Sequence, residues 1–192
     1  MTFSQNVITN TENKIIPEKI SNEVATALSF YPELKEVCIE FKFKSSLSKS
    51  FMKAQPKFTS LIKPKDKRKY VILMSKTFKI DGLELKIQDV PSNVLIGWIG
   101  HELGHIMDYQ NRSSINLVFF GLKYWLSESY IREAERAADT YAVTHSMKDY
   151  ILETKKFILN HSSLSEKYKE RIRQLYLSPD EILLLVEEQE QN

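Results

Sequence analysis

Apolar positions in the first half of the chain repeat mainly every second residue. Residues 37–44 alternate between apolar and charged side chains, which predicts a strand with one buried face. Residues 70–74 form a short apolar run rich in strand formers, and residues 83–87 alternate again after the turn-forming pair Asp81-Gly82. Apolar residues at helical spacing over residues 17–31 predict a helix before these strands. The pattern therefore predicts a small antiparallel sheet beside a helix.

The hydrophobic period changes to that of helices in the second half of the chain. Ser92 to about Gln110 is apolar on almost every side, which predicts a buried helix. Further helical stretches follow over residues 127–147 and 165–177, and the sequence Ser178-Pro179-Asp180-Glu181 is typical of a helix start. The C-terminal half is therefore expected to be mostly helical.

Length and composition fit one folded domain. The chain has 192 residues, of which 42% are hydrophobic and 27% are charged, and these values are ordinary for globular proteins. We expect an α+β fold in a single domain over residues 1–192. Within it we expect a loose N-terminal segment over residues 1–16, a strand-containing lobe over residues 17–90 and a helical lobe over residues 91–192.

Cys38 is the single cysteine, so the chain can form neither an internal disulfide framework nor a cysteine zinc cluster. A metal site would have to use His, Asp or Glu. Residues 1–10 are polar and lack the basic and apolar regions of a secretion signal. We therefore expect a cytoplasmic protein.

The net charge of +2 hides an uneven distribution along the chain. Residues 1–90 contain 16 basic and 10 acidic residues, whereas residues 91–192 contain 11 basic and 15 acidic residues. The densest basic stretch, residues 63–69, includes Pro64 and has the chemistry to contact phosphate or an anionic membrane. No aromatic residues interrupt it and no nucleic-acid module accompanies it, so we expect a solvated loop and no nucleic-acid partner.

The predicted buried helix contains the pattern His101-Glu102-Leu103-Gly104-His105. Histidines four residues apart lie one above the other on a helix, where both imidazoles can reach one tetrahedral ion. Glu102 is turned away from that stripe and flanks the ion, where it can take a proton from a metal-activated water. The chain has only 4 histidines, so a chance match is rare. The pattern predicts a zinc site with Glu102 as general base.

Two histidines leave a catalytic zinc ion one protein ligand short, so a third donor is expected further along the chain. Glu135 and Asp139 are four residues apart on a predicted helix, beside small residues. Gly97, Gly100 and Gly104 form a comparable stripe beside the histidines, so that the two helices can approach closely. One carboxylate could then reach the ion, and Asp139 could accept a hydrogen bond from a ligating histidine. Asp108, near the histidine face, is an alternative donor.

These motifs resemble the gluzincin metallopeptidases, especially the HtpX and CAAX-prenyl-protease group and the small soluble minigluzincins. The resemblance lies in the His-Glu-x-x-His pattern and the stretch from Glu135 to Ala142. It implies a zincin-like fold with an active-site helix and a glutamate helix. It also implies zinc bound by His101, His105 and Glu135, with Asp139 in contact with a ligand.

The resemblance further implies an upstream edge strand that aligns a peptide substrate, for which residues 70–74 are the candidate. His161, followed by Glu170-Arg171-Ile172, is similar to a segment of HtpX-type enzymes, and it is our candidate for a catalytic residue that stabilises the oxyanion. Residues 115–126 are strongly apolar but too short for a transmembrane helix. We expect them to pack on the glutamate helix, with peripheral membrane contact as the alternative.

The sequence therefore predicts a zinc-dependent endopeptidase that acts on a polypeptide substrate. An alternative is a metallopeptidase similar to the ImmA/IrrE group, which acts on regulatory proteins and shares the His-Glu-x-x-His pattern. Another alternative is a non-catalytic protein that binds zinc for structure. The presence of Glu102 favours an enzyme, because a structural site has no need of a base.

Overall fold

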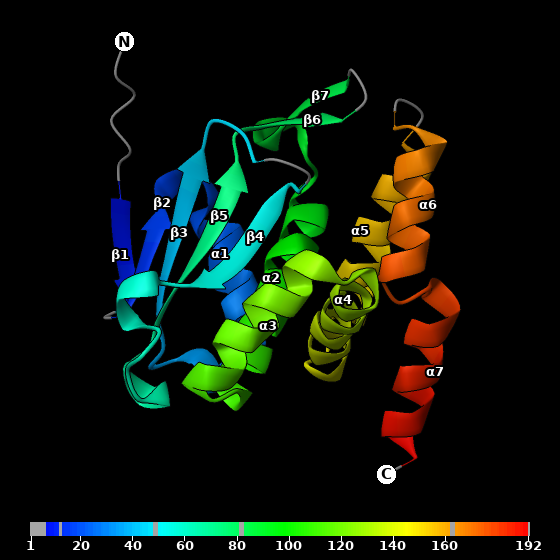
Figure 1. Cartoon of the computed structure of the whole chain (residues 1–192). Coiled ribbons are helices and arrows are strands. Elements are labelled where there is room, and N and C mark those ends of the chain that lie inside the picture. Colours follow the sequence, from blue (N-terminus) through cyan, green and yellow to red (C-terminus); the bar gives the residue numbers. More distant parts are fainter. Residues whose placement is uncertain (1–6, 12, 48–49, 81–82, 162–163, 192) are drawn as a thin grey trace.

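The computed structural model describes residues 7–11, 13–47, 50–80, 83–161 and 164–191. Five of the described strands form one sheet, in the order β1-β2-β3-β5-β4 (Figure 1). Their bounds are β1 Val7–Thr11, β2 Lys14–Pro17, β3 Cys38–Lys44, β4 Met52–Pro56 and β5 Lys69–Ser75. A separate hairpin consists of β6 Thr77–Ile80 and β7 Leu83–Lys86, while the predicted turn pair Asp81-Gly82 lies outside the described residues.

The α+β class is confirmed, but the sheet is mixed rather than antiparallel. β2, β3 and β5 run parallel, whereas β1 and β4 pair antiparallel with β2 and β5. Parallel neighbours need a long connection. The chain between β3 and β5 supplies it and forms β4 on its way. The N-terminal segment is also not loose throughout, because β1 and β2 lie within residues 7–17.

Seven of the described segments are α-helices, and they dominate the second half of the chain as predicted. Their bounds are α1 Ser21–Ser29, α2 Ser92–Asn111, α3 Ser114–Leu126, α4 Glu128–Thr144, α5 Lys148–Asn160, α6 Glu166–Leu175 and α7 Pro179–Glu190. No helix in the described part of the chain combines the length and the apolar character needed to cross a bilayer.

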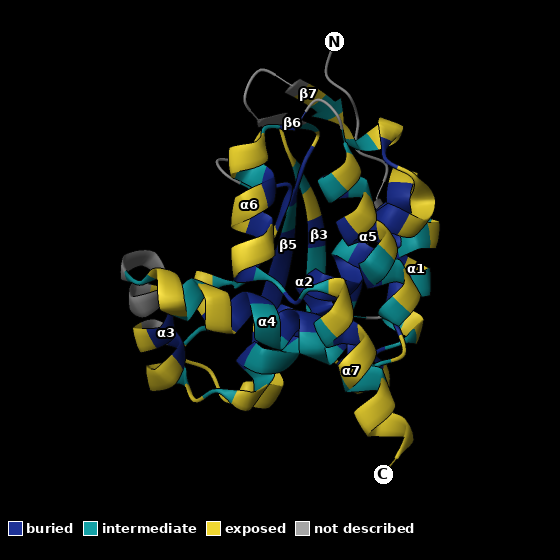
Figure 2. Cartoon of the chain, turned by 90° about the vertical axis from the view of Figure 1, so that its right-hand side faces the viewer, coloured by how far each residue is buried: buried dark blue, intermediate teal, exposed yellow. Residues whose placement is uncertain are grey.

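Helix α2 lies at the centre of the core, between the sheet and the helices α4 and α5 (Figure 1). Ile99, Leu103 and Ile106 are completely buried, which explains why this helix is apolar on almost every side. In Figure 2, most of α2 and β5 is coloured as buried, whereas α6 and α7 are exposed on their outer sides. The core therefore holds the helix that carries the predicted site.

Glycines on α2 allow its neighbours to approach closely. A Cβ atom at Gly104 would collide with the carbonyl oxygen of Ala138 on α4, and one at Gly97 would collide with Thr154 on α5. The predicted close approach of α2 and α4 is therefore confirmed at Gly104, whereas Gly97 faces α5 and not α4. This close approach brings the histidines of α2 within reach of carboxylates on α4.

Candidate metal centre

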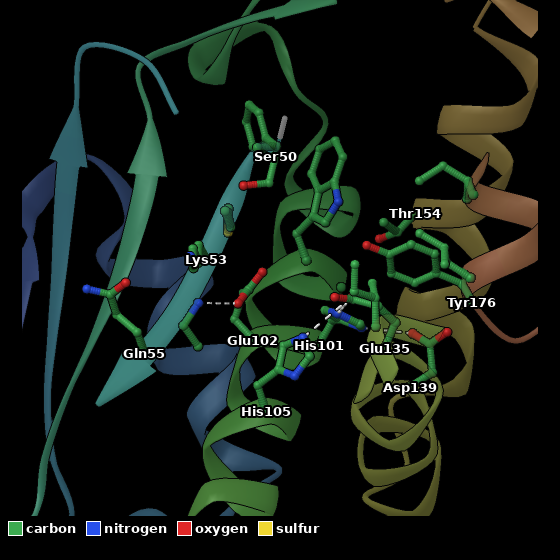
Figure 3. A pocket seen from close by; sticks show the side chains of 18 of the residues that line it. Ser50, Lys53, Gln55, His101, Glu102, His105, Glu135, Asp139, Thr154 and Tyr176 are labelled. Atoms are coloured by element: carbon green, nitrogen blue, oxygen red, sulfur yellow. Dashed lines mark hydrogen bonds and ion pairs between the residues drawn. The ribbon is translucent and has the colours of Figure 1, made fainter. Parts of the chain in front are cut away.

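Three side chains that the sequence predicts as metal ligands meet in the structure. His101 and His105 come from α2 and Glu135 comes from α4, and their ligand atoms all lie within 4.8 Å of one another. The Glu135 Oε2 atom is 3.1 Å from His101 Nε2 and 3.5 Å from His105 Nε2. All three residues are buried, so the three donor atoms converge at a position with little exposure to solvent (Figure 3).

This donor set fits a zinc ion. Two imidazole nitrogens and one carboxylate oxygen are the protein ligands of several catalytic zinc sites, which keep a fourth position open. The Nε2 atoms of both histidines face the same Glu135 oxygen, at 3.1 and 3.5 Å, so the three donor atoms point toward one common position. The cluster therefore has the chemistry and spacing to hold a divalent cation.

Asp139 contacts His101, as the sequence predicts. Its Oδ1 atom lies 2.9 Å from His101 Nδ1, and its Oδ2 atom accepts hydrogen bonds from Lys155 Nζ at 2.7 Å and from the Leu177 backbone N–H at 3.0 Å. A carboxylate at Nδ1 leaves the Nε2 atom of the imidazole free to face a metal. Asp139 thus fixes the orientation of one ligand and is itself fixed by two donors.

The charged groups of the cluster shift the pKa values of one another. Burial by itself lowers the pKa of His101, but hydrogen bonds to Asp139 and Glu135 outweigh it and raise the pKa to about 10. Burial also raises the pKa of Glu135, yet His105 and His101 hold it well below the usual range. Metal binding must therefore release the proton that His101 carries in the metal-free protein.

Glu102 lies on the other side of the histidines, toward the sheet (Figure 3). Its Oε2 atom accepts a hydrogen bond of 2.5 Å from the backbone N–H of Ala54 on β4. Burial raises the pKa of Glu102, and the neighbouring histidines offset only part of this effect. A raised pKa brings a carboxylate closer to the range in which it can both accept and return a proton.

The edge strand beside the site is β4, not the strand of residues 70–74. β5 lies between β3 and β4, so the predicted edge strand is wrong. At Ala54, the N–H bonds to Glu102 and the carbonyl oxygen accepts a hydrogen bond of 3.4 Å from Tyr109 Oη. Alternation of Met52 and Ala54 with charged or amide residues was the weak signal that could have indicated this strand.

A cleft of about 670 Å³ opens at the cluster, between β4 on one side and α5 and α6 on the other. Sequence reasoning missed several of its polar residues, which local patterns do not reveal. They are Lys155, Tyr168 and Tyr176. Figure 3 shows Tyr176 on the side of the site away from β4, and its ring centre lies 5.4 Å from that of His101.

The structure does not bring His161 to this cleft. The residue follows α5, where it packs edge-to-face on Phe157 at 5.4 Å, and it is not among the residues that line the cleft. Its Nδ1 atom is buried without a hydrogen-bond partner among the described residues. Arg171, from the Glu170-Arg171-Ile172 segment of the same resemblance, does line the cleft. Asp108 instead pairs with Arg112 at 2.7 Å.

Residues 115–126 form most of α3. Leu117 and Phe120 are buried and line the cleft, whereas Ile115 and Phe119 point outward. This helix therefore forms one wall of the site and also part of the molecular surface.

No protein-family model, curated protein or solved structure matches this chain. The geometry of the site itself therefore carries the functional argument.

Proposed function

We propose that this protein is a zinc-dependent peptidase of the gluzincin type with a zincin-like fold. The observation that carries the proposal is the buried cluster of His101, His105 and Glu135, with the carboxylate of Glu102 beside it and an edge strand at the same cleft. A structural zinc site usually has four protein ligands and no such base.

His101, His105 and Glu135 would hold the ion. Once bound, zinc would act as a Lewis acid toward a carbonyl group and lower the pKa of water at the open position. Asp139 would keep His101 in the orientation that presents Nε2 to the ion.

Glu102 would be the general base. It accepts a proton from the attacking water and passes it to the amine that leaves when the peptide bond breaks. Its raised pKa suits both transfers. A carboxylate with a higher pKa accepts the proton of water more readily, and its pKa remains low enough to give the proton to an amine. Its hydrogen bond to Ala54 holds the carboxylate between the strand and the histidines.

β4 would align the polypeptide substrate by backbone pairing along its free edge. An extended peptide can add to such an edge through main-chain hydrogen bonds. The N–H and C=O groups of Ala54 are bonded to Glu102 and Tyr109, so a peptide that pairs at this residue must displace these contacts. Tyr168, Arg171 and Tyr176 replace His161 as candidates to donate a hydrogen bond to the oxyanion, because they line the cleft.

The first test compares zinc content and cleavage of a peptide library. We expect one zinc ion per chain in the wild type and in Glu102→Gln, and loss of zinc in His105→Ala and Glu135→Ala, because only these last two changes remove ligands. Cleavage should disappear in all three variants. Glu153→Gln on α5 is the matched control, because Glu153 is exposed, and it should retain full activity.

Two outcomes would contradict the proposal in different ways. Wild-type protein that contains no zinc after purification without chelators would refute the metal site. Wild-type protein that retains zinc but cleaves no peptide faster than Glu102→Gln would refute the peptidase and leave a zinc-binding protein.

A further inference from the structure

Four large apolar side chains are unusually exposed in two segments of the chain. Phe58 and Ile62, after β4, are 90% and 88% exposed, and Ile115 and Phe119 on α3 are 71% and 57% exposed. Exposed apolar side chains that gather in one region often mark an interaction surface. None of the four takes part in the candidate metal centre.

Hydrogen bonds hold these two segments together. Arg68 donates to the backbone oxygen of Arg112 at 2.7 Å and to Ser114 Oγ at 3.0 Å, and Lys65 donates to the backbone oxygen of Asn111 at 3.3 Å. Figure 1 shows the turns between β4 and β5 beside the start of α3, on the side of the molecule opposite to α6. The two segments therefore form one region, which we call the basic apolar face and define as residues 57–69 and 111–119.

The α3 part of this face has a clear division between inside and outside. Ile115 and Phe119 are four residues apart, so they share the outward side of the helix. Leu117 and Phe120 occupy the inward side and line the cleft. The outward apolar residues therefore do not contribute to the core.

The charge of this face is strongly positive. Residues 57–69 contain six basic side chains and a single acidic one, and residues 111–119 contain no acidic residue. Lys63, Lys65, Lys67 and Lys69 are exposed, whereas Arg68 is buried and holds the segments together. A face that combines exposed apolar side chains with exposed lysines complements a surface that carries negative charge outside and apolar groups just below it.

We propose that the basic apolar face binds the headgroup region of an anionic lipid bilayer. The lysines would bind lipid phosphate and carboxylate groups, while Phe58, Ile62, Ile115 and Phe119 would enter the interface. A nucleic acid fits less well, because two of the four exposed apolar side chains, Ile62 and Ile115, are aliphatic and offer no ring for bases to stack on. This inference does not depend on the proposed peptidase activity.

The proposal also fixes where the cleft would lie. The outward side of α3 would touch the bilayer while its inward side lines the cleft. Because a helix is about 10 Å across, one wall of the cleft would lie within about 10 Å of the membrane surface.

The test is co-sedimentation of the whole chain with vesicles. We expect binding to vesicles that contain phosphatidylserine, little binding to pure phosphatidylcholine, and weaker binding at high salt, because exposed charges are screened. The double variant Lys63→Glu, Lys67→Glu should bind at least about 30-fold more weakly, since each lysine near the surface contributes about fivefold to the affinity. Phe58→Ser with Ile62→Ser should weaken binding at both salt concentrations.

Two double variants on other surfaces provide matched controls. Lys156→Glu with Lys167→Glu, and Leu183→Ser with Leu184→Ser, change exposed residues of the same types and should bind vesicles like the wild type. All variants should show the same thermal unfolding and bind the same amount of zinc, which separates lost binding from misfolding.

Several results would overturn the proposal. These are equal binding to neutral and anionic vesicles, equal losses in the test and control variants, and absence of binding. Self-association that Phe58→Ser with Ile62→Ser abolishes would show that the face joins two copies of the chain instead. Tighter binding to RNA or DNA than to anionic vesicles would identify a nucleic-acid surface.

Discussion

Lys155 is a charged residue placed almost out of contact with solvent. Its ammonium group lies 2.7 Å from Asp139 and 4.9 Å from the centre of the Tyr176 ring. Asp139 in turn contacts His101, so Lys155 stands one step further from the candidate metal than Asp139 does. Because a buried carboxylate needs a partner, Lys155 keeps Asp139 ionised and in place.

We expect Lys155→Met to weaken zinc binding by about 10- to 100-fold, the usual cost of losing an outer partner of a metal ligand. It should also lower the stability of the metal-free protein by about 1.5–3 kcal/mol, because buried Asp139 loses one charged partner and keeps His101 and the Leu177 N–H. Competition with a zinc chelator and thermal unfolding measure the two effects. Lys156→Met on the exposed side of the same helix should change neither, and equal zinc affinities for all three proteins would show that Lys155 is not coupled to the site.

At the scale of elements, the site depends on how closely α2 approaches α4. Gly104 faces the backbone of Ala138, so the distance between the two helices is set where no side chain intervenes. His105 follows Gly104 directly on α2, and His101 and Glu135 each lie about one turn from this contact, on α2 and α4. A wider separation would move the carboxylate away from the imidazoles.

Gly104→Ala should therefore destabilise the protein by about 1–3 kcal/mol, as overpacking of a core does, and should weaken zinc binding as well. Chemical denaturation and chelator competition measure these changes. Gly121→Ala on α3 offers a contrast, because a Cβ atom there meets nothing within 4 Å. It should stabilise the helix by up to about 1 kcal/mol, and a Gly104→Ala protein as stable as the wild type would contradict the close contact.

For the whole molecule, the cluster of buried charges links stability to pH. In the metal-free protein the pKa of His101 is about 10, above the 6.5 of an ordinary histidine. The protonated form is therefore favoured by folding. Its contribution to stability is fully present below about pH 6.5 and is lost progressively as the pH rises toward 10.

We therefore expect the Tm of the metal-free protein, kept in chelator, to fall between pH 6.5 and pH 9. Asp139→Asn should show a shallower fall, because it removes one of the two carboxylates that raise the pKa of His101. Thermal unfolding at several pH values is the measurement. A Tm that stays constant or rises over this range would mean that His101 is not protonated in the folded metal-free chain.

The helical part of the site follows from local patterns in the sequence. Spacing along α2 and α4 correctly places His101, His105, Glu135 and Asp139 on facing sides, because the helical period is a property of neighbouring residues. The small residues that let the helices approach are visible in the same way. The burial of α2 can also be predicted from the sequence, because apolar residues occupy almost every side of this helix.

The tertiary structure alone decided the features that depend on distant parts of the chain. Strand order made β4 the edge strand rather than β5, because pairing partners are chosen across the sheet and not along the sequence. Packing of α5 against its neighbours leaves His161 outside the cleft and brings Lys155, from the middle of the helix, to Asp139. Helix periodicity is local, so the candidate ligands and Asp139 can be predicted from the sequence. Long-range packing is needed to place β4 beside Glu102 and Lys155 beside Asp139.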